Sequence, residues 1–462
     1  MEKLCCLGLA LVAIVGGIAC GGVGRGSGDA GPADIASSGG QPAVGGAPAT
    51  GGAAGNVGGT TTLGGAPGTG GAVRSSGGTT TLGGAPGTGG ATGGTGGTTR
   101  ADGGLGTGGT TVDAGAGLGL WSMGYYASWA ADQYPVSEIE WSGLTHIAMA
   151  FYLPQSNGSL SLSAGDTKLV SDLLTAAHAH GVKAIASIGG SDSQAGFQKA
   201  TTSGTVATFA NNLAALVTST GYDGIDIDWE PLDKTDEPAV IDIASRIRKA
   251  APTAALTIPI GEININLGAD LSNYAAIAAA YDQLNIMSYG QAGAWSGWKS
   301  WHSSALYQKD SATPTSIDST VKLYLAANVP AAKLGIGIGF YGLCYSPPVT
   351  GPDQALNGAT LVASDGTISY ANIMKSYYSA DVRKWDDFAR VPYLSFATAH
   401  APDGCGYISY DDEQSIAEKA VYIKAQGLGG VIQWELNEGY LSTAAAGQRN
   451  PLLAAIRDSV LR

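Results

Sequence analysis

The stretch Asp223-Gly224-Ile225-Asp226-Ile227-Asp228-Trp229-Glu230 places four acids inside an apolar run. Because a β-strand turns successive side chains to opposite faces, Asp226, Asp228 and Glu230 should share one face of a strand. Side chains two residues apart lie roughly 6.6 Å apart along a strand, and repulsion between neighbouring carboxylates raises a pKa. The pattern therefore predicts a strand whose acidic face suits general acid–base chemistry, with Glu230, the last acid, as the proton donor.

A solvated strand end or a metal-binding row would also account for these acids. Burying three carboxyl groups beside Ile225, Ile227 and Trp229 without a use is costly, which favours a functional site. The chain has only five histidines, and neither this number nor the cysteine spacing supports a metal site. We therefore expect general acid–base chemistry and no bound metal.

Short β-like runs recur after Trp121, with helical patterns between them. Residues 169–177, for example, have helical apolar spacing that ends at Gly181. Eight strands alternating with helices predict an α/β fold of the (β/α)8 type, the TIM barrel, whose active sites lie at the carboxyl ends of the strands. Glu230 follows the fourth run. The predicted strands are Met123–Tyr126, Thr145–Phe151, Ala184–Ile188, Gly224–Trp229, Leu256–Ile260, Gln283–Tyr289, Leu334–Gly339 and Gly430–Trp434.

The gap between the seventh and eighth strands is too long for a plain loop and helix, so residues near 343–393 are expected to form a small insertion. Cys344 and Cys405 are the only cysteines beyond residue 20. An even pair of cysteines in an exported chain predicts a disulfide, and two buried free thiols are the alternative.

The amino-terminal residues predict export. An apolar run from Leu4 to Ile18 follows Lys3 and is too short to span a bilayer, but it has the length of a signal-peptide core, so residues 1–19 are expected to be a signal peptide. Ala19-Cys20 resembles the end of a bacterial lipoprotein signal, which makes Cys20 the candidate lipidated residue. Ordinary cleavage is the alternative, because Gly17 stands where leucine is usual. We expect a secreted or cell-surface protein, attached to a membrane only through Cys20.

Residues 20–118 are rich in glycine, alanine and threonine, and one segment of this region begins at Gly58 and is repeated from Gly77. With little apolar surface to bury, the region is predicted to be a disordered tether before a catalytic domain at 119–462. The formal net charge of −13 argues against a nucleic-acid partner, since it leaves no basic stripe to neutralise phosphates.

The octet resembles the D-x-x-D-x-D-x-E signature of family 18 glycoside hydrolases, the chitinase family, and matches all four acids. The resemblance continues in order from Met123 to about Leu436. Met287-Ser288-Tyr289 looks like the sixth-strand motif, and Trp434 looks like the tryptophan beneath the reactive sugar. Gly124-Tyr125-Tyr126, Leu144-Thr145-His146-Ile147 with Ala150-Phe151, and Ser187-Ile188-Gly189-Gly190 look like the first three strands.

The resemblance implies a role for each acid. Glu230 would protonate the leaving oxygen and later activate water, Asp228 would orient the acetamido group, and Asp226 would share a proton with Asp228. Asp223 would support the row, and Tyr289 would hold the acetamido oxygen. Family 18 enzymes are substrate-assisted, so the substrate's own N-acetyl oxygen attacks the anomeric carbon. The β configuration would be retained, and no cofactor is expected.

Further candidates are aromatic or lie beside these motifs. An indole face packs against the C–H face of a sugar, although core packing is the alternative for each. We expect one or two of Trp295, Trp298 and Trp301 to form an outer sugar platform, with His302 as a lesser candidate. The predicted substrate-binding residues are Tyr126, Phe151, Asp223, Met287, Trp295, Trp298 and Trp434.

The expected function is hydrolysis of β-1,4-linked N-acetylglucosamine polymers, above all chitin, by a monomer. An endo-β-N-acetylglucosaminidase, a cell-wall glycosidase and a sugar-binding lectin on the same barrel are the alternatives. Family lectins usually have lost the acid that corresponds to Glu230, which favours an enzyme. The chain departs from the family where Gly290 replaces a frequent Asp or Asn and where Leu343 replaces a frequent Arg.

Overall fold

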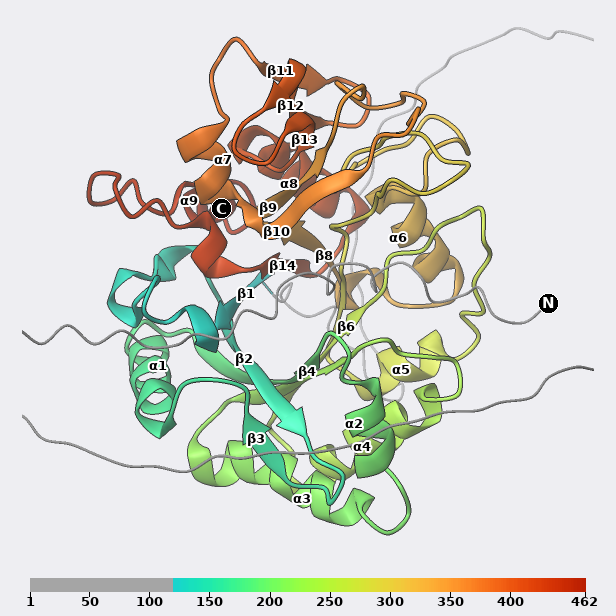
Figure 1. Ribbon diagram of the computed structural model, residues 1–462. Coiled ribbons are helices and arrows are strands. Elements are labelled where there is room, and N and C mark those ends of the chain that lie inside the picture. The colour runs from blue at the N-terminus through green and yellow to red at the C-terminus, as the bar shows by residue number, and fades with distance from the viewer. Residues whose placement is uncertain (1–118) are drawn as a thin grey trace, which may run out of the picture. The chain divides into compact units, whose positions relative to one another are not determined.

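The computed structural model describes residues 119–462, so the signal peptide, Cys20 and the tether predicted for residues 1–118 lie outside the described residues. Its main sheet contains the following parallel strands: β1 (Trp121–Ala127), β2 (His146–Pro154), β4 (Lys183–Gly190), β5 (Gly224–Trp229), β6 (Ala255–Ile260), β7 (Gln283–Ile286), β8 (Leu334–Gly339) and β14 (Gly430–Trp434). Their spatial order is β1-β14-β8-β7-β6-β5-β4-β2, and β1 also pairs with β2, which closes a barrel (Figure 1). The predicted TIM barrel is confirmed.

Helices surround this barrel (Figure 1). In α1 the side chain of Asp166 caps the first turn by accepting a hydrogen bond from the Leu169 amide (2.8 Å), and Gly181 takes a left-handed conformation (φ 70°) just after the helix. No helix of residues 119–462 is both long and apolar enough to cross a membrane. The helices are α1 (Thr167–Ala179), α2 (Gln194–Ala200), α3 (Val206–Ala215), α4 (Glu237–Ala250), α5 (Tyr274–Ala280), α6 (Ile317–Ala326), α7 (Tyr370–Ser376), α8 (Glu413–Gln426) and α9 (Pro451–Ser459).

Strand β5 has the two faces that its sequence predicts. Ile225, Ile227 and Trp229 are buried in the large core cluster, and the Trp229 ring stacks on Phe197 of α2 with centroids 4.6 Å apart. Asp226 and Asp228 point to the opposite side because successive side chains alternate. The apolar face of β5 thus anchors the strand while the acidic face is free to line the barrel interior.

One barrel strand is shorter than predicted. Strand β7 ends at Ile286 instead of Tyr289, because the Ser288 side chain takes over the pairing with β8. Its Oγ donates to the Gly337 carbonyl (2.9 Å) and accepts from the Gly337 amide (2.8 Å). Tyr289 therefore lies beyond the sheet, at the carboxyl end of the barrel.

The insertion between β8 and β14 is a five-stranded antiparallel sheet in the order β10-β9-β13-β12-β11. It extends beyond the predicted 343–393 range, because the central strand of the sheet is β13, which pairs with β9 and lies after residue 393. In Figure 1 these strands form the orange group beside β8 and β14. The strands are β9 (Tyr341–Tyr345), β10 (Leu361–Ser369), β11 (Arg383–Asp386), β12 (Val391–His400) and β13 (Cys405–Ser409), while the short β3 (Leu160–Leu162) pairs with β2.

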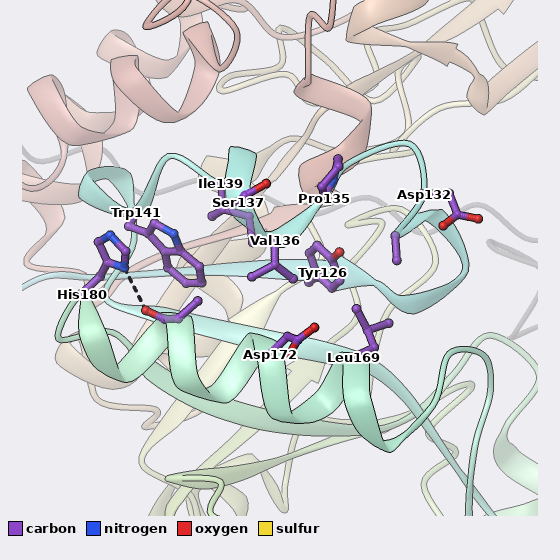
Figure 2. Close-up of a pocket in the computed structure, with 12 residues that line it drawn as sticks. Tyr126, Asp132, Pro135, Val136, Ser137, Ile139, Trp141, Leu169, Asp172 and His180 are labelled. Atoms are coloured by element: carbon purple, nitrogen blue, oxygen red, sulfur yellow. Dashed lines mark hydrogen bonds between the residues drawn. The ribbon is translucent and has the colours of Figure 1, made fainter.

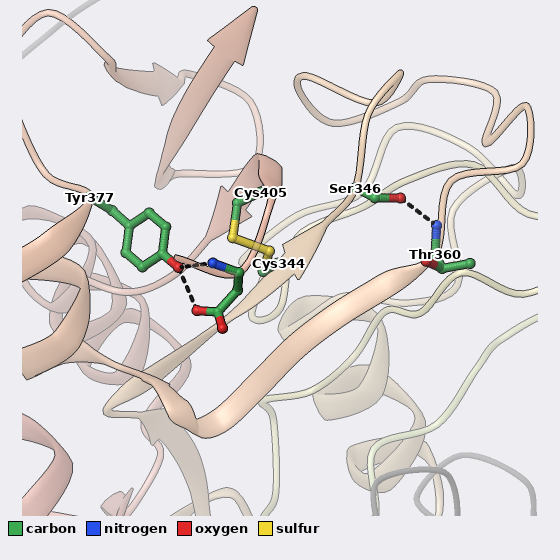
Figure 3. Close-up of a disulfide and its surroundings, with 6 residues drawn as sticks. Cys344, Ser346, Thr360, Tyr377 and Cys405 are labelled. Atoms are coloured by element: carbon green, nitrogen blue, oxygen red, sulfur yellow. Dashed lines mark hydrogen bonds between the residues drawn. A yellow bond between two sulfur atoms is a disulfide. The ribbon is translucent and has the colours of Figure 1, made fainter. Parts of the chain in front are cut away.

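A disulfide joins β9 to β13 through Cys344 and Cys405 (Figure 3). Their Cα atoms are 5.4 Å apart, inside the limit of roughly 7 Å beyond which a bridge would need backbone movement. Nearby, the Tyr377 hydroxyl donates to Asp403 Oδ2 (2.5 Å) and accepts from the Asp403 amide (3.1 Å). The bridge and this pair fix the turn that leads into β13 beside α7.

We expect the bridge to stabilise the fold. The two cysteines are 61 residues apart, and closing a loop of this length contributes about 4 kcal/mol in the chain-entropy model. Replacing both cysteines by serine should lower the midpoint of urea unfolding. Peptide mapping without reduction should recover the two cysteine peptides as one cross-linked species. Recovery of both peptides carrying a thiol label in unreduced protein would contradict the pairing.

Candidate active site

Asp226 lies at the centre of the barrel and is fully buried. Three hydroxyl groups from other barrel strands donate to its carboxylate: Tyr125 Oη of β1 (2.9 Å), Ser187 Oγ of β4 (2.8 Å) and Thr257 Oγ1 of β6 (2.5 Å). Burial raises the pKa of Asp226, while these hydrogen bonds act in the opposite direction. These three hydrogen bonds hold the Asp226 carboxyl in one orientation beneath the rest of the row.

Asp228 shares a hydrogen bond with Glu230, the next acid of the row. Burial, and then the charges of Glu230 and Asp226, raise the pKa of Asp228 well above its ordinary value. The Asp228 Oδ1 atom has no hydrogen-bond partner among the described residues. In this conformation Asp228 turns toward Glu230, and the sharing of a proton between Asp228 and Asp226 stays a prediction.

Glu230 directly follows β5 and is partly exposed, at the carboxyl end of the barrel. Ser193 holds this corner, since its Oγ donates to the Asp228 carbonyl (3.1 Å) and accepts from the Glu230 amide (3.1 Å). Burial of the carboxyl raises the pKa of Glu230 to about 7; the hydrogen bond with Asp228 lowers it, and the charges of Asp192 and Asp226 raise it. A carboxyl group with such a pKa can carry a proton near neutral pH and release it to a substrate.

Tyr289 faces the acid row from the end of β7. Its ring packs on Gly337 of β8, where an added Cβ would lie 2.6 Å from the ring, so only glycine leaves room for the tyrosine. Burial raises the pKa of Tyr289 well above its ordinary value, and the charges of Tyr341, Asp228 and Glu230 raise it further. The Tyr289 hydroxyl is therefore neutral and lies close enough to the acids to be affected by their charges.

Aromatic rings from three strands gather beside this space. The Trp434 ring stacks on Phe151 (centroids 5.7 Å apart) and lies 5.5 Å from Tyr125. Trp129, just after β1, lies 6.4 Å from Trp434 and is 49% exposed. An exposed ring next to a partly buried one forms an apolar surface at the open end of the barrel, which suits the C–H faces of sugar rings.

A cavity of about 630 Å³ opens beside Glu230, between the loops that follow β5 and β6. Met287 and Glu262 line it together with Glu230. Burial raises the pKa of Glu262 to about 7, and the charge of Glu230 contributes to the shift. Glu230 therefore lines a cavity that holds a second carboxyl group with a raised pKa.

The sequence pattern of Glycosyl hydrolases family 18 matches residues 122–439, which include the barrel, the acid row and the insertion. The chain belongs to this family. A chitinase-like effector of Moniliophthora perniciosa is 27% identical over 72% of this chain and 85% of its own length. Chitinase A1 of Niallia circulans is 30% identical over 55% of this chain and 40% of its own length. Among solved structures, a mutant of catalytic domain 2 of the Ostrinia furnacalis Group II chitinase, in complex with (NAG)5, has a TM-score of 0.61 at 22% identity, covering 74% of this chain and 96% of that one.

Within this family 18 barrel, Tyr126 is not part of the site, contrary to the prediction. Its hydroxyl donates to the Tyr134 carbonyl (2.9 Å), and its ring lines a cavity of about 680 Å³ outside the barrel, among Pro135, Val136 and Leu169 (Figure 2). The adjacent Tyr125 points inward and contacts Asp226 instead. One residue of register on β1 decides which of the two tyrosines reaches the acids.

Asp223 is also remote from the substrate side. It precedes β5, and its Oδ2 accepts from the Ala184 amide (2.7 Å) and lies 2.9 Å from His178 Nε2. Glu230 follows the opposite end of the same strand, so Asp223 ties β5 to β4 at the closed end of the barrel. Asp223 therefore has a structural role in this chain.

The three tryptophans after β7 differ. Trp301 is buried in the core of the insertion and donates to the Thr315 carbonyl (3.1 Å), so it is a packing residue. Trp295 covers Gly293 and is partly exposed, like Trp298. In residues 119–462 no hydrogen bond or ring contact joins Trp295 or Trp298 to the acid row, and their place on a sugar platform stays a prediction. His302 is fully buried beside Tyr407 (2.9 Å) and does not face the substrate side.

Several residues of the site escaped the sequence analysis. Tyr125, Trp129 and Glu262 have no distinctive spacing of their own, although Trp129 and Glu262 each follow a barrel strand, which is where barrel enzymes place functional groups. Gly290 stands where the family often has Asp or Asn. Its backbone is left-handed (φ 64°), and an added Cβ would lie 3.2 Å from the Tyr341 hydroxyl. Tyr341 thus occupies space next to the position where the family often carries Asp or Asn.

Proposed function

We propose that this family 18 protein hydrolyses β-1,4-linked N-acetylglucosamine polymers, above all chitin, by substrate-assisted catalysis with retention of configuration. The single observation that carries the proposal is Glu230, a carboxyl group with a pKa of about 7, hydrogen-bonded to Asp228 and lining a cavity at the carboxyl end of the barrel. A reacting sugar on Trp434 would bring its glycosidic oxygen next to Glu230.

In the proposed mechanism, each residue of the site has one part. Glu230 gives its proton to the leaving oxygen, while the N-acetyl oxygen of the reacting sugar attacks the anomeric carbon. Asp228 holds the acetamido N–H with its unpartnered Oδ1, and Tyr289 donates to the acetamido oxygen. Glu230 then removes a proton from the water that opens the cyclic intermediate. Asp226 keeps its hydrogen bonds throughout and stabilises the positive charge that develops above it.

The relatives bear on the choice between hydrolase and lectin. One relative is named as an enzyme, Chitinase A1, and another only as a chitinase-like effector. Family membership alone therefore does not decide between a hydrolase and a lectin. This chain keeps all the acids of the row, which favours an enzyme. The Ostrinia furnacalis chitinase domain solved in complex with (NAG)5 supports a chito-oligosaccharide as the ligand of this chain.

Wild-type protein incubated with chitin oligomers, and separately with a glycoprotein glycan, should release products from the oligomers. Release from the glycan alone would favour an endo-β-N-acetylglucosaminidase.

The pH dependence of hydrolysis should report the protonated form of Glu230. A general acid is active only while protonated, so kcat/KM should fall as the pH rises through about 7, the pKa of Glu230. Asp192 raises this pKa by its charge, so Asp192→Asn should move the alkaline limb to lower pH. Asn tolerates the left-handed backbone of this position (φ 62°). Asp242→Asn, an exposed change on α4, is the control and should leave the limb in place. An unchanged limb in Asp192→Asn would contradict this account of the pKa.

We also propose export with lipidation at Cys20, as Lys3, the apolar run to Ile18 and Ala19-Cys20 support. In a bacterial host, wild-type protein should incorporate labelled fatty acid and sediment with membranes. Cys20→Ser should do neither and should accumulate in the soluble exported fraction. Membrane association without fatty acid would contradict the lipid anchor.

A further inference from the structure

Beside Trp434 lies a group of three acids, Asp365, Glu435 and Glu438, here called the carboxyl cluster. Trp434 Nε1 donates to Asp365 Oδ1 (3.3 Å), so the cluster borders the sugar surface directly. Asp365 lies on β10 of the insertion, while Glu435 and Glu438 follow β14. Two segments far apart in the sequence thus bring three carboxyl groups to one edge of the site.

The cluster lacks the partners that buried acids normally have. Glu435 and Glu438 are only 5% and 4% exposed, and the Oε2 atom of each has no hydrogen-bond partner among the described residues. Buried polar atoms are almost always satisfied, so two such atoms in one place call for a missing partner. Asn437 supplies only one donor, to Glu435 Oε1 (2.9 Å).

The three acids also act on one another without a nearby cation among the described residues. Burial, then Asp365 and Glu435, raise the pKa of Glu438 well above its ordinary value, and burial with the charge of Asp365 raises the pKa of Glu435 to about 7. No lysine or arginine of residues 119–462 contributes to the pKa of any of the three acids. Across the sheet, Leu343 pairs with Ser364, the neighbour of Asp365, so the adjacent strand supplies no cation there.

Access to the cluster is through Asp365. Its side chain is partly exposed, and its backbone is left-handed (φ 48°) at an irregular part of the β9–β10 pairing. Glu438 lies behind it, since a Cβ on the next residue, Gly366, would be 3.5 Å from Glu438 Oε1. A cation bound to Asp365 would therefore also be attracted electrostatically by the two buried acids, Glu435 and Glu438.

We propose that the carboxyl cluster binds the ammonium group of a glucosamine residue, so that the protein is adapted to partly deacetylated chitin. The inference rests on the proposed function, which places the reacting sugar on Trp434. That sugar needs its acetyl group for substrate-assisted attack, so the glucosamine is its neighbour on the non-reducing side, away from Glu230 and the leaving group. A metal ion is the less suitable occupant, because no group of three or more acids, histidines or cysteines in the described part of the chain is arranged to hold one.

Binding to defined tetramers tests the proposal. One tetramer is fully acetylated and the other carries a single glucosamine next to the reacting position. Calorimetric titration in a Glu230→Gln background measures affinity without turnover, so a failure of the proposed hydrolysis does not hide the result. The parent should bind the glucosamine tetramer at least as tightly as the acetylated one. Asp365→Asn and Glu438→Gln keep the side-chain shape and remove the ionisable group. Each should reduce the affinity ratio, that of the glucosamine tetramer divided by that of the acetylated tetramer, about tenfold, the usual scale for a charged hydrogen bond.

Two controls make the outcome decisive. Asp242→Asn removes an exposed charge on α4, where Asp242 pairs with Arg246, and should leave the ratio unchanged. N-acetylating the single amine should abolish the effect of both cluster variants. An unchanged ratio in folded Asp365→Asn and Glu438→Gln would overturn the proposal, as would tighter binding of the acetylated tetramer by the parent. Competition by millimolar calcium, lost in the same variants, would overturn it in favour of a metal site.

Discussion

Glu230→Gln should reduce kcat on chitin oligomers by about 10²–10⁴-fold, the usual contribution of a positioned general acid. The amide keeps the size of the side chain but cannot give a proton to the leaving oxygen. Because Trp434, Phe151 and Tyr289 are untouched, the variant should still bind oligomers with near-normal affinity. Stopped assays of reducing-end release, together with calorimetric titration, measure the two effects separately.

The matched variant Glu262→Gln shows whether the loss of kcat is specific to Glu230. Glu262→Gln alters the second carboxyl group of the cavity, which lies on the neighbouring loop and not on the acid row. Its loss should cost far less in kcat than the loss of Glu230. Near-normal hydrolysis by Glu230→Gln, with a large defect in Glu262→Gln, would transfer the acid role to Glu262.

Asp228→Asn should produce the second large effect, a loss of kcat by roughly 10²-fold or more, since Asp228 both contacts Glu230 and holds the acetamido group. Asn has the shape of Asp but cannot gain or lose a proton. Glu230 would then titrate without a second ionisable group beside it, so the pH dependence of kcat should also change. Mass spectrometry of the working wild-type enzyme should detect no covalent sugar on the protein. A glycosyl ester on Asp228 would defeat the substrate-assisted reading.

The fold was predictable because its signals repeat along the chain. Eight apolar runs mark the barrel, and three of them, β5, β8 and β14, begin and end at the predicted residues. Strand β5 carries its own two-sided pattern, so the inward direction of Asp226 and Asp228 follows from alternation alone. The insertion was harder to delimit, because the pairing of β9 with β13 joins distant residues and leaves no local signal.

The site was predictable only where a motif fixed the register. Tyr125 and Tyr126 are adjacent and chemically alike, and only the tilt and pairing of β1 decide which faces Asp226. Likewise, the hydrogen bond between Asp228 and Glu230 depends on side-chain rotation, which sequence does not encode. Asp365 reaches Trp434 from the insertion, a contact between residues 69 positions apart.

If the substrate's acetyl group and Glu230 cleave the bond together, the β configuration at the anomeric carbon is retained. Proton NMR of the wild-type protein with chitohexaose, recorded before the products mutarotate, tests this most directly. We predict that new reducing ends appear as the β anomer and that the Glu230→Gln protein produces none on the same time scale. New ends in the α configuration, or no cleavage by folded wild-type protein, would contradict the account.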